Sequence, residues 1–126
     1  MATATASLKD GRVAAGTKDG LFATYKDGNV FSYGNAAAMG PVRCMCIAPD
    51  GVLYGVAGDV EDVGTVFCFD DVKGLKQLGF INYNAPGWMD GPTAANLLSS
   101  AAVSPDGKYL AIGGADRIGS VHIIRL

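Results

Sequence analysis

The segment Ser104-Pro-Asp-Gly-Lys-Tyr-Leu-Ala-Ile-Gly-Gly114 joins an Asp-Gly turn to a short apolar segment. Glycine accepts a positive φ and aspartate bonds its own backbone, so this dipeptide favours a tight β-hairpin. The same plan occurs earlier in the chain around Asp10-Gly11 and around Asp50-Gly51. The sequence therefore contains three copies of one supersecondary unit.

Each repeat continues through the same order of segments after its turn. The second segment ends in a polar loop, and a third then begins: Leu21-Phe-Ala-Thr-Tyr25, Thr65-Val-Phe-Cys-Phe69 or Ser120-Val-His-Ile-Ile124. Two repeats add a fourth segment, Val30-Phe-Ser-Tyr-Gly34 or Leu75-Lys-Gln-Leu-Gly-Phe80, whereas the third repeat stops at Leu126 without one. These segments are short, rich in β-branched and aromatic residues and bounded by turn residues, so the sequence predicts an all-β protein.

The Asp-Gly turns lie 40 and 56 residues apart. A period near 40 with four strands is typical of β-propeller blades. The longer spacing places an insertion at residues 82–97. We predict one partial β-propeller domain of three four-stranded blades, at about 2–35, 42–81 and 98–126, the last lacking its outer strand. A plain antiparallel sandwich uses similar strands, but it does not require the same four-strand plan to recur in order.

Residues Ser104 to Gly114 resemble the first hairpin of blades in Trp-Asp repeat proteins, TolB-like propellers and lactonase-like propellers. The order of strands and turns resembles that of such blades over nearly the whole chain, but the resemblance is specific to no one of these families. The Trp-Asp dipeptide and the Gly-His signature of the first family are absent from the sequence. What the resemblance implies is an architecture, and an architecture does not assign a function.

Three blades leave two apolar sheet faces uncovered, because each blade of a propeller buries one face against the next. Two chains supply six blades, a common closure, and two-fold symmetry is the commonest oligomeric arrangement. We therefore expect a homodimer in which each chain is half of a six-bladed ring. The missing twelfth strand is then either absent or supplied by the partner's N-terminus. The alternative is that the chain is a piece of a longer propeller, with Ala2 to Leu8 as a first strand.

Composition narrows the classes of partner. The 126 residues carry a formal net charge of −2 with dispersed Lys and Arg, so we expect no nucleic-acid partner. No stretch approaches the about 20 apolar residues that span a bilayer, and the N-terminus has no signal-peptide pattern, so we expect a cytoplasmic protein with no membrane partner. The three cysteines are an odd number without metal-ligand spacing. Cys44 and Cys46 are expected to be buried apolar residues on one strand face.

The blade resemblance also implies where a ligand would bind. In propellers, the loops between second and third strands and the loops between blades emerge on one face, where ligands usually bind. An exposed Trp beside carboxylates and amides suits a sugar or small polar ligand. An alternative is that Trp88 plugs a blade junction or the dimer contact. The candidate ligand-binding residues are Tyr83, Asn84, Trp88, Asp90, Asp59, Glu61, Asp62, Asp116 and Arg117.

The leading functional hypothesis is a non-catalytic binding or interaction module for a carbohydrate, a small polar ligand or a protein. We identify no catalytic residues, metal ligands or cofactor site. The acidic run Asp59 to Asp62 matches no calcium-loop spacing, and His122, in the middle of a predicted strand, is the one histidine of the sequence. The rival hypothesis is a hydrolase or lyase that acts on a sugar or lactone through carboxylates near a central channel. Its candidate residues are Asp59, Glu61, Asp62 and Asp90.

Overall fold

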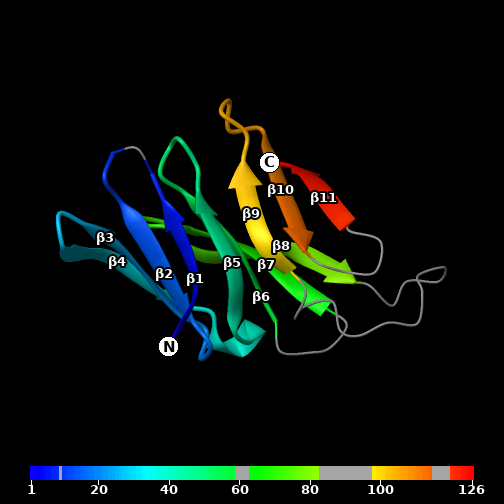
Figure 1. Ribbon diagram of the computed structural model, residues 1–126, viewed down its shortest axis with the longest axis horizontal. Helices are drawn as coiled ribbons and strands as arrows, with labels where there is room; N and C mark the ends of the chain where they lie inside the picture. The colour runs from blue at the N-terminus through cyan, green and yellow to red at the C-terminus, as the bar shows by residue number, and fades with distance from the viewer. Residues whose placement is uncertain (9, 59–62, 83–97, 115–119) are drawn as a thin grey trace.

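The protein is an all-β molecule in which three antiparallel sheets stand side by side (Figure 1). The computed structural model describes residues 1–8, 10–58, 63–82, 98–114 and 120–126. Within them the one helical element is a single 3-10 turn, η1 (Ala37–Met39), and no described helix has the length and apolarity to cross a membrane. The prediction of an all-β fold is confirmed.

The sheets follow the three sequence repeats. Sheet 1 contains β1 (Ala2–Ser7), β2 (Val13–Thr17), β3 (Leu21–Lys26) and β4 (Asn29–Asn35). Sheet 2 contains β5 (Val42–Ile47), β6 (Leu53–Ala57), β7 (Val63–Asp70) and β8 (Gly74–Asn82). Sheet 3 contains β9 (Leu98–Val103), β10 (Tyr109–Gly114) and β11 (Ser120–Arg125). Each sheet is an open meander in chain order, so the expected sequence of four, four and three strands is present.

The three Asp-Gly hairpins are built by the same hydrogen bonds. In each, the glycine has a positive φ, of 87°, 91° and 72° in chain order. Each glycine N–H donates to the carbonyl three residues earlier: Gly11 to Leu8, Gly51 to Ala48 and Gly107 to Ser104. The aspartate Oδ1 accepts the N–H two residues further on, at 3.0 Å for Asp10 and 3.1 Å for Asp50 and Asp106. This turn chemistry, expected of Asp-Gly, makes the first two strands of each repeat a hairpin.

The third hairpin is one residue longer than the other two. Leu8 and Ala48 donate to the carbonyl four residues on, whereas Ser104 N–H donates to the carbonyl of Tyr109, five residues on. One added residue reverses which side chains of the following strand face the core. Leu110 is therefore buried and Tyr109 is 45% exposed.

Sheet 2 lies between the other two sheets and is covered on both faces. The first strands of the three sheets lie next to one another, and we call them the innermost strands: β1 packs beside β5, and β5 packs beside β9. We call the face of a sheet that points to the following sheet its forward face, and the opposite one its rear face. Because side chains alternate along a strand, Met45 and Phe67 point rearward to sheet 1 while Cys44 and Val66 point forward to sheet 3.

Two separate cores fill the two junctions. The core between sheets 1 and 2 contains Ala4, Ala14, Phe22, Ala36, Val42, Met45, Ile47, Leu53, Ala57, Phe67 and Phe69. The core between sheets 2 and 3 contains Cys44, Cys46, Val56, Val66, Ile81, Leu98, Leu110 and Ile112. Burial on both faces explains why β5 is nearly continuous in apolar residues, whereas β1 alternates Ala with Thr.

Aromatic rings join sheets 1 and 2 directly. The Phe22 ring of β3 stacks on the Phe67 ring of β7, with centroids 5.4 Å apart, and meets the edge of Phe69 at 5.0 Å. Gly16 of β2 permits a close approach of β2 to Val42 of β5, since a Cβ at Gly16 would lie 2.6 Å from the Val42 Cγ1. The two sheets are therefore packed face to face by contacts between residues far apart in the sequence.

The N-terminal segment forms a strand within its own chain. The N-terminal segment Ala2–Ser7 is β1, paired antiparallel with β2 inside its own chain. The homodimer, with its twelfth strand either absent or supplied by the partner's N-terminus, stays a prediction. Residues 2–8 as a first strand, the alternative reading of the N-terminus, matches the observed pairing.

Candidate functional site

All nine candidate ligand-binding residues of the sequence analysis lie outside the described residues. Asp59, Glu61 and Asp62 fall between β6 and β7, and Asp116 and Arg117 fall between β10 and β11. The remaining four, Tyr83, Asn84, Trp88 and Asp90, belong to the segment between β8 and β9. The site that they were predicted to form therefore stays a prediction, and the described geometry concerns the strands and connections that border it.

The described loop from β2 to β3, the connection from β4 to β5 and the end of β6 lie together at one end of the molecule. Ala36 N–H, in the connection from β4 to β5, donates to the carbonyl of Gly20, in the loop from β2 to β3, at 2.7 Å. Gly58 N–H, directly after β6, donates to the carbonyl of Pro41, directly before β5, at 2.9 Å. Loops within a sheet and connections between sheets thus meet at one end, opposite the Asp-Gly hairpins (Figure 1). We call this the loop end.

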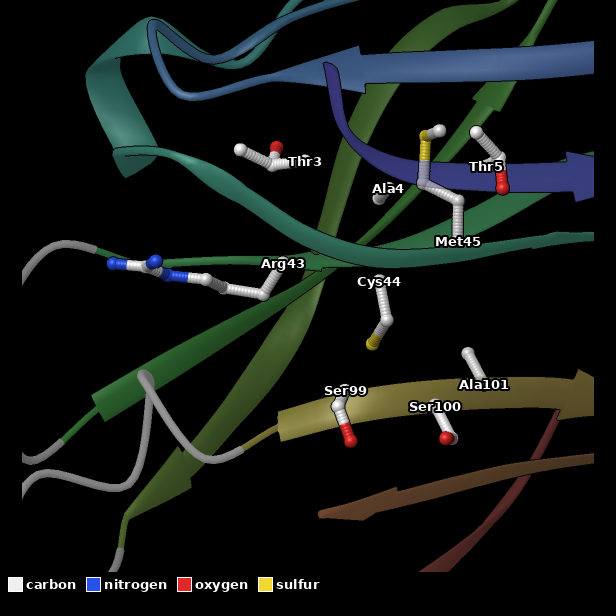
Figure 2. Close-up of a pocket in the computed structure, with 9 residues that line it drawn as sticks. All are labelled: Thr3, Ala4, Thr5, Arg43, Cys44, Met45, Ser99, Ser100 and Ala101. Carbon is white, nitrogen blue, oxygen red and sulfur yellow. The ribbon is translucent and has the colours of Figure 1, made fainter. Parts of the chain in front are cut away.

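An open groove of about 330 Å³ lies where the three innermost strands begin, beside the loop end. Its lining comes in equal parts from the starts of β1, β5 and β9 (Figure 2). The residues are Thr3, Ala4, Thr5, Arg43, Cys44, Met45, Ser99, Ser100 and Ala101. Hydroxyl groups and one guanidinium give this surface hydrogen-bonding side chains, and its volume falls in the range of small-molecule sites.

The groove is lined by equivalent positions of the three repeats. Measured back from the Asp of each Asp-Gly turn, Thr3, Arg43 and Ser99 occupy one position, and the two residues after each of them complete the set. One repeated unit thus contributes the same three positions each time. The chemistry differs between repeats, because β1 offers threonines, β5 offers a cation, and β9 offers serines.

Arg43 is the charged residue of the groove lining. Its Nε donates to the carbonyl of Gly58 at 3.0 Å, which fixes the side chain against the end of β6. In Figure 2 the side chain runs from β5 toward the loop end. The two terminal nitrogens carry donors that suit a carboxylate, a phosphate or a sugar hydroxyl.

Thr3 forms a hydrogen bond across the junction between sheets 1 and 2. Its Oγ1 donates to the carbonyl of Val42 at 2.6 Å and also lies 3.3 Å from the carbonyl of Gly16. The other hydroxyl-bearing residues of the groove, Thr5, Ser99 and Ser100, are exposed. The groove therefore has one structural hydroxyl and three that face solvent.

The thiols of Cys44 and Cys46, near the groove, are unreactive at neutral pH. Burial raises the pKa of Cys44 to about 11 and that of Cys46 to about 12, so both remain protonated at neutral pH. A protonated thiol is neither a good nucleophile nor a metal ligand. Both side chains lie in the core between sheets 2 and 3, as expected of buried apolar residues on one strand face. In Figure 2 the Cys44 side chain points toward β9 and that of Met45 toward β1.

Within the described residues, no three His, Cys, Asp or Glu side chains come together as a metal site would require. His122 is half-buried in β11, opposite Ile112 of β10, as expected for a residue in the middle of a strand. Sequence reasoning missed the groove residues, because Thr, Ser and Arg are ordinary residues of a half-exposed strand. Comparing equivalent positions of the repeats would have found them, since the first strands of stacked repeats share one edge of the molecule.

No protein-family model matches the sequence, and no curated protein matches it either. Among solved structures, the chain is similar to one described as "Crystal structure of the computationally designed Ika4 protein", with 11% sequence identity and a TM-score of 0.45. The similarity covers 100% of this chain and 91% of that chain.

Proposed function

We propose that the three sheets are consecutive β-propeller blades and that the chain is a non-catalytic binding module. The observation that carries the proposal is the groove, where the innermost strands of three like sheets begin together. Radially stacked blades place their first strands around one axis, and ligands of such folds bind where loops border that axis. The face-to-face packing of the sheets and the Asp-Gly turn that opens each of them support the same arrangement.

The ligand we propose is a small carbohydrate or a similar polyhydroxylated compound. Hydroxyl groups of Thr5, Ser99 and Ser100 both donate and accept hydrogen bonds, which matches the hydroxyls of a sugar. Arg43 adds donors that suit a ring oxygen, a hydroxyl or the carboxylate of a sugar acid. No carboxylate is among the described residues that line the groove, so the described part of the site has no acid or base pair for hydrolysis.

Binding can be tested with a panel of neutral sugars and sugar acids, measured by thermal shift and by saturation-transfer NMR. We expect at least one member to raise the melting temperature in a saturable way, because a ligand that binds only the folded state stabilises it. Arg43→Ala should weaken that binding about tenfold or more, since one charge-assisted hydrogen bond is worth roughly 1.5–3 kcal/mol.

A matched control is Lys76→Ala, which removes a cation from β8 of the same sheet, away from the groove. That variant should bind as the unmodified protein does. Binding that is equally sensitive to both substitutions, or no binding across the panel, would contradict the proposed site.

The alternative of a hydrolase or lyase stays a prediction. It depends on Asp59, Glu61, Asp62 and Asp90, all outside the described residues. Turnover of a sugar or lactone by the purified protein that is lost on Asp62→Asn would replace the binding proposal by the enzymatic one.

A further inference from the structure

Two apolar sheet faces remain uncovered, one at each side of the stack. On the rear face of sheet 1, Val13, Leu21, Val30 and Tyr33 are 46%, 50%, 58% and 78% exposed. On the forward face of sheet 3, Tyr109, Val121 and Ile123 are 45%, 68% and 63% exposed. Contiguous apolar residues on a sheet face mark a surface that another polypeptide covers.

These two faces are the unmatched halves of a junction that the chain builds twice. Each internal junction joins the forward face of one sheet to the rear face of the next. One forward face and one rear face are left over. A second copy of this chain offers both halves at once, so its sheet 3 can pack on sheet 1 of the first copy by continuing the internal pattern.

We propose that two copies of the chain pack head to tail, each placing the forward face of its sheet 3 on the rear face of the other's sheet 1. Six sheets then form one ring around a two-fold axis with two identical seams. The two-copy count follows from blade numbers that close propellers, so it rests on the proposed propeller arrangement. The seam itself rests on the matching of the faces.

Repeat equivalence indicates which residues meet at the seam. In the first internal junction, Phe22 on the forward face of β3 contacts Phe67 and Phe69 on the rear face of β7. Phe22 is paired with Gly16 in its sheet, as Val121 is paired with Gly113 in sheet 3. Val121 therefore stands at the Phe22 position of its sheet.

The partners of Phe22 have equivalents in sheet 1. Phe67 pairs with Gly55, and Ala23 pairs with Ala15 at the same place in the repeat, so Ala23 takes the Phe67 position. By the same comparison of registers, Tyr25 takes the Phe69 position. The seam thus places Val121 of one copy against Ala23 and Tyr25 of the other.

A hydrogen bond extends the equivalence to the groove. Thr3 Oγ1 donates to the carbonyl of Val42 across the first junction. Ser99 stands at the Thr3 position and Ala2 at the Val42 position of their repeats. In the dimer, Ser99 of one copy therefore lies beside Ala2 of the other, and the groove continues around the axis.

The test uses two charge variants, Val121→Lys and Ala23→Glu, and their mixture. Each variant alone places an unpaired charge in both seams, so we expect its dimer dissociation constant to rise at least about 100-fold. In an equimolar mixture, one seam joins unmodified faces and the other pairs Lys with Glu, so sedimentation should show the dimer restored. Phe80→Lys, which changes an exposed residue of the middle sheet, should remain dimeric.

Several outcomes would overturn the inference. If one variant alone stays dimeric while the other does not, the faces pair with themselves rather than head to tail. Larger assemblies, or an unmodified protein that is monomeric, would also contradict it. Far-UV circular dichroism shows whether the variants fold. Should they not, Ala2→Cys combined with Ser99→Cys gives a second test, in which oxidation should yield a covalent dimer that neither single variant forms. None of these readouts involves a ligand, so their failure is distinct from failure to bind sugar.

Discussion

The contact of Phe22 with Phe67 offers a quantitative test of sheet stacking, because it joins two sheets through residues far apart in sequence. Both side chains are almost fully buried, at 3% and 0% exposure, and their rings stack at 5.4 Å. Replacing each by Leu keeps an apolar side chain and removes the ring, so each single variant should lose about 1–2 kcal/mol of unfolding free energy. Alanine would cost about 3–5 kcal/mol, a large part of the total stability of a small domain.

A double-mutant cycle isolates the cross-sheet term. An aromatic pair contributes roughly 0.5–1.5 kcal/mol beyond its buried area, so the double variant should be more stable than the sum of the single losses predicts, by that amount. Urea unfolding at one fixed protein concentration measures the unfolding free energy of the unmodified protein, the two single variants and the double variant. Phe80→Leu is the control, since Phe80 is 63% exposed and its change should alter stability by less than about 0.5 kcal/mol. Additive losses within about 0.3 kcal/mol would refute direct packing of the two rings.

Three further predictions concern the turns and the thiols. Gly107→Ala should lower the unfolding free energy, measured by urea unfolding, by about 1–2 kcal/mol, and Gly79→Ala should lower it by much less. Both sites have open space around an added Cβ, but of the two only Gly107 has a positive φ, of 72°. Cys44 and Cys46 should react with Ellman's reagent at pH 8 far more slowly in the native protein than in urea; equal rates would show that they are accessible. Because folding raises both thiol pKa values from 9.0, their contribution to stability is complete below pH 9 and is lost as the pH rises toward 11 and 12. The melting temperature should therefore fall above pH 9, and less steeply in a Cys44→Ala, Cys46→Ala variant.

Local sequence signals were sufficient to predict the strands and the Asp-Gly hairpins. The Asp-Gly turns depend only on glycine's positive φ and on an aspartate that bonds its neighbour's N–H, and both are properties of adjacent residues. The third and fourth segments of the first repeat are joined by the same dipeptide, Asp27-Gly28, whose residues both have a positive φ. The all-β class and the strand order of each repeat could therefore be predicted without knowledge of distant contacts.

The orientation of the third hairpin could not be predicted in the same way. Aligning the repeats on Asp-Gly places Tyr109 opposite Leu53, which suggests that Tyr109 is buried. The added residue Lys108 shifts the register instead, so Leu110 takes the core position. Which of the two faces inward depends on packing against sheet 2, a contact that a local pattern does not contain.

The site predicted from the sequence and the groove seen in the structure use different kinds of residue. Sequence reasoning selected unusual residues in loops, such as Trp88, and these lie outside the described part of the chain. The groove instead uses common residues, Thr5, Arg43 and Ser100, whose importance comes from stacking three strands at one edge. Their chemistry is visible in the sequence, but their convergence is a property of the stacked sheets.

If the stacked repeats leave two matching faces for a second copy, the mass of the 126-residue protein in solution, measured by sedimentation equilibrium, should be that of a dimer. We predict a single species of twice the 12.9 kDa chain mass over the micromolar range. A stable species of 12.9 kDa across that range would contradict the account, because both apolar faces would then remain in water.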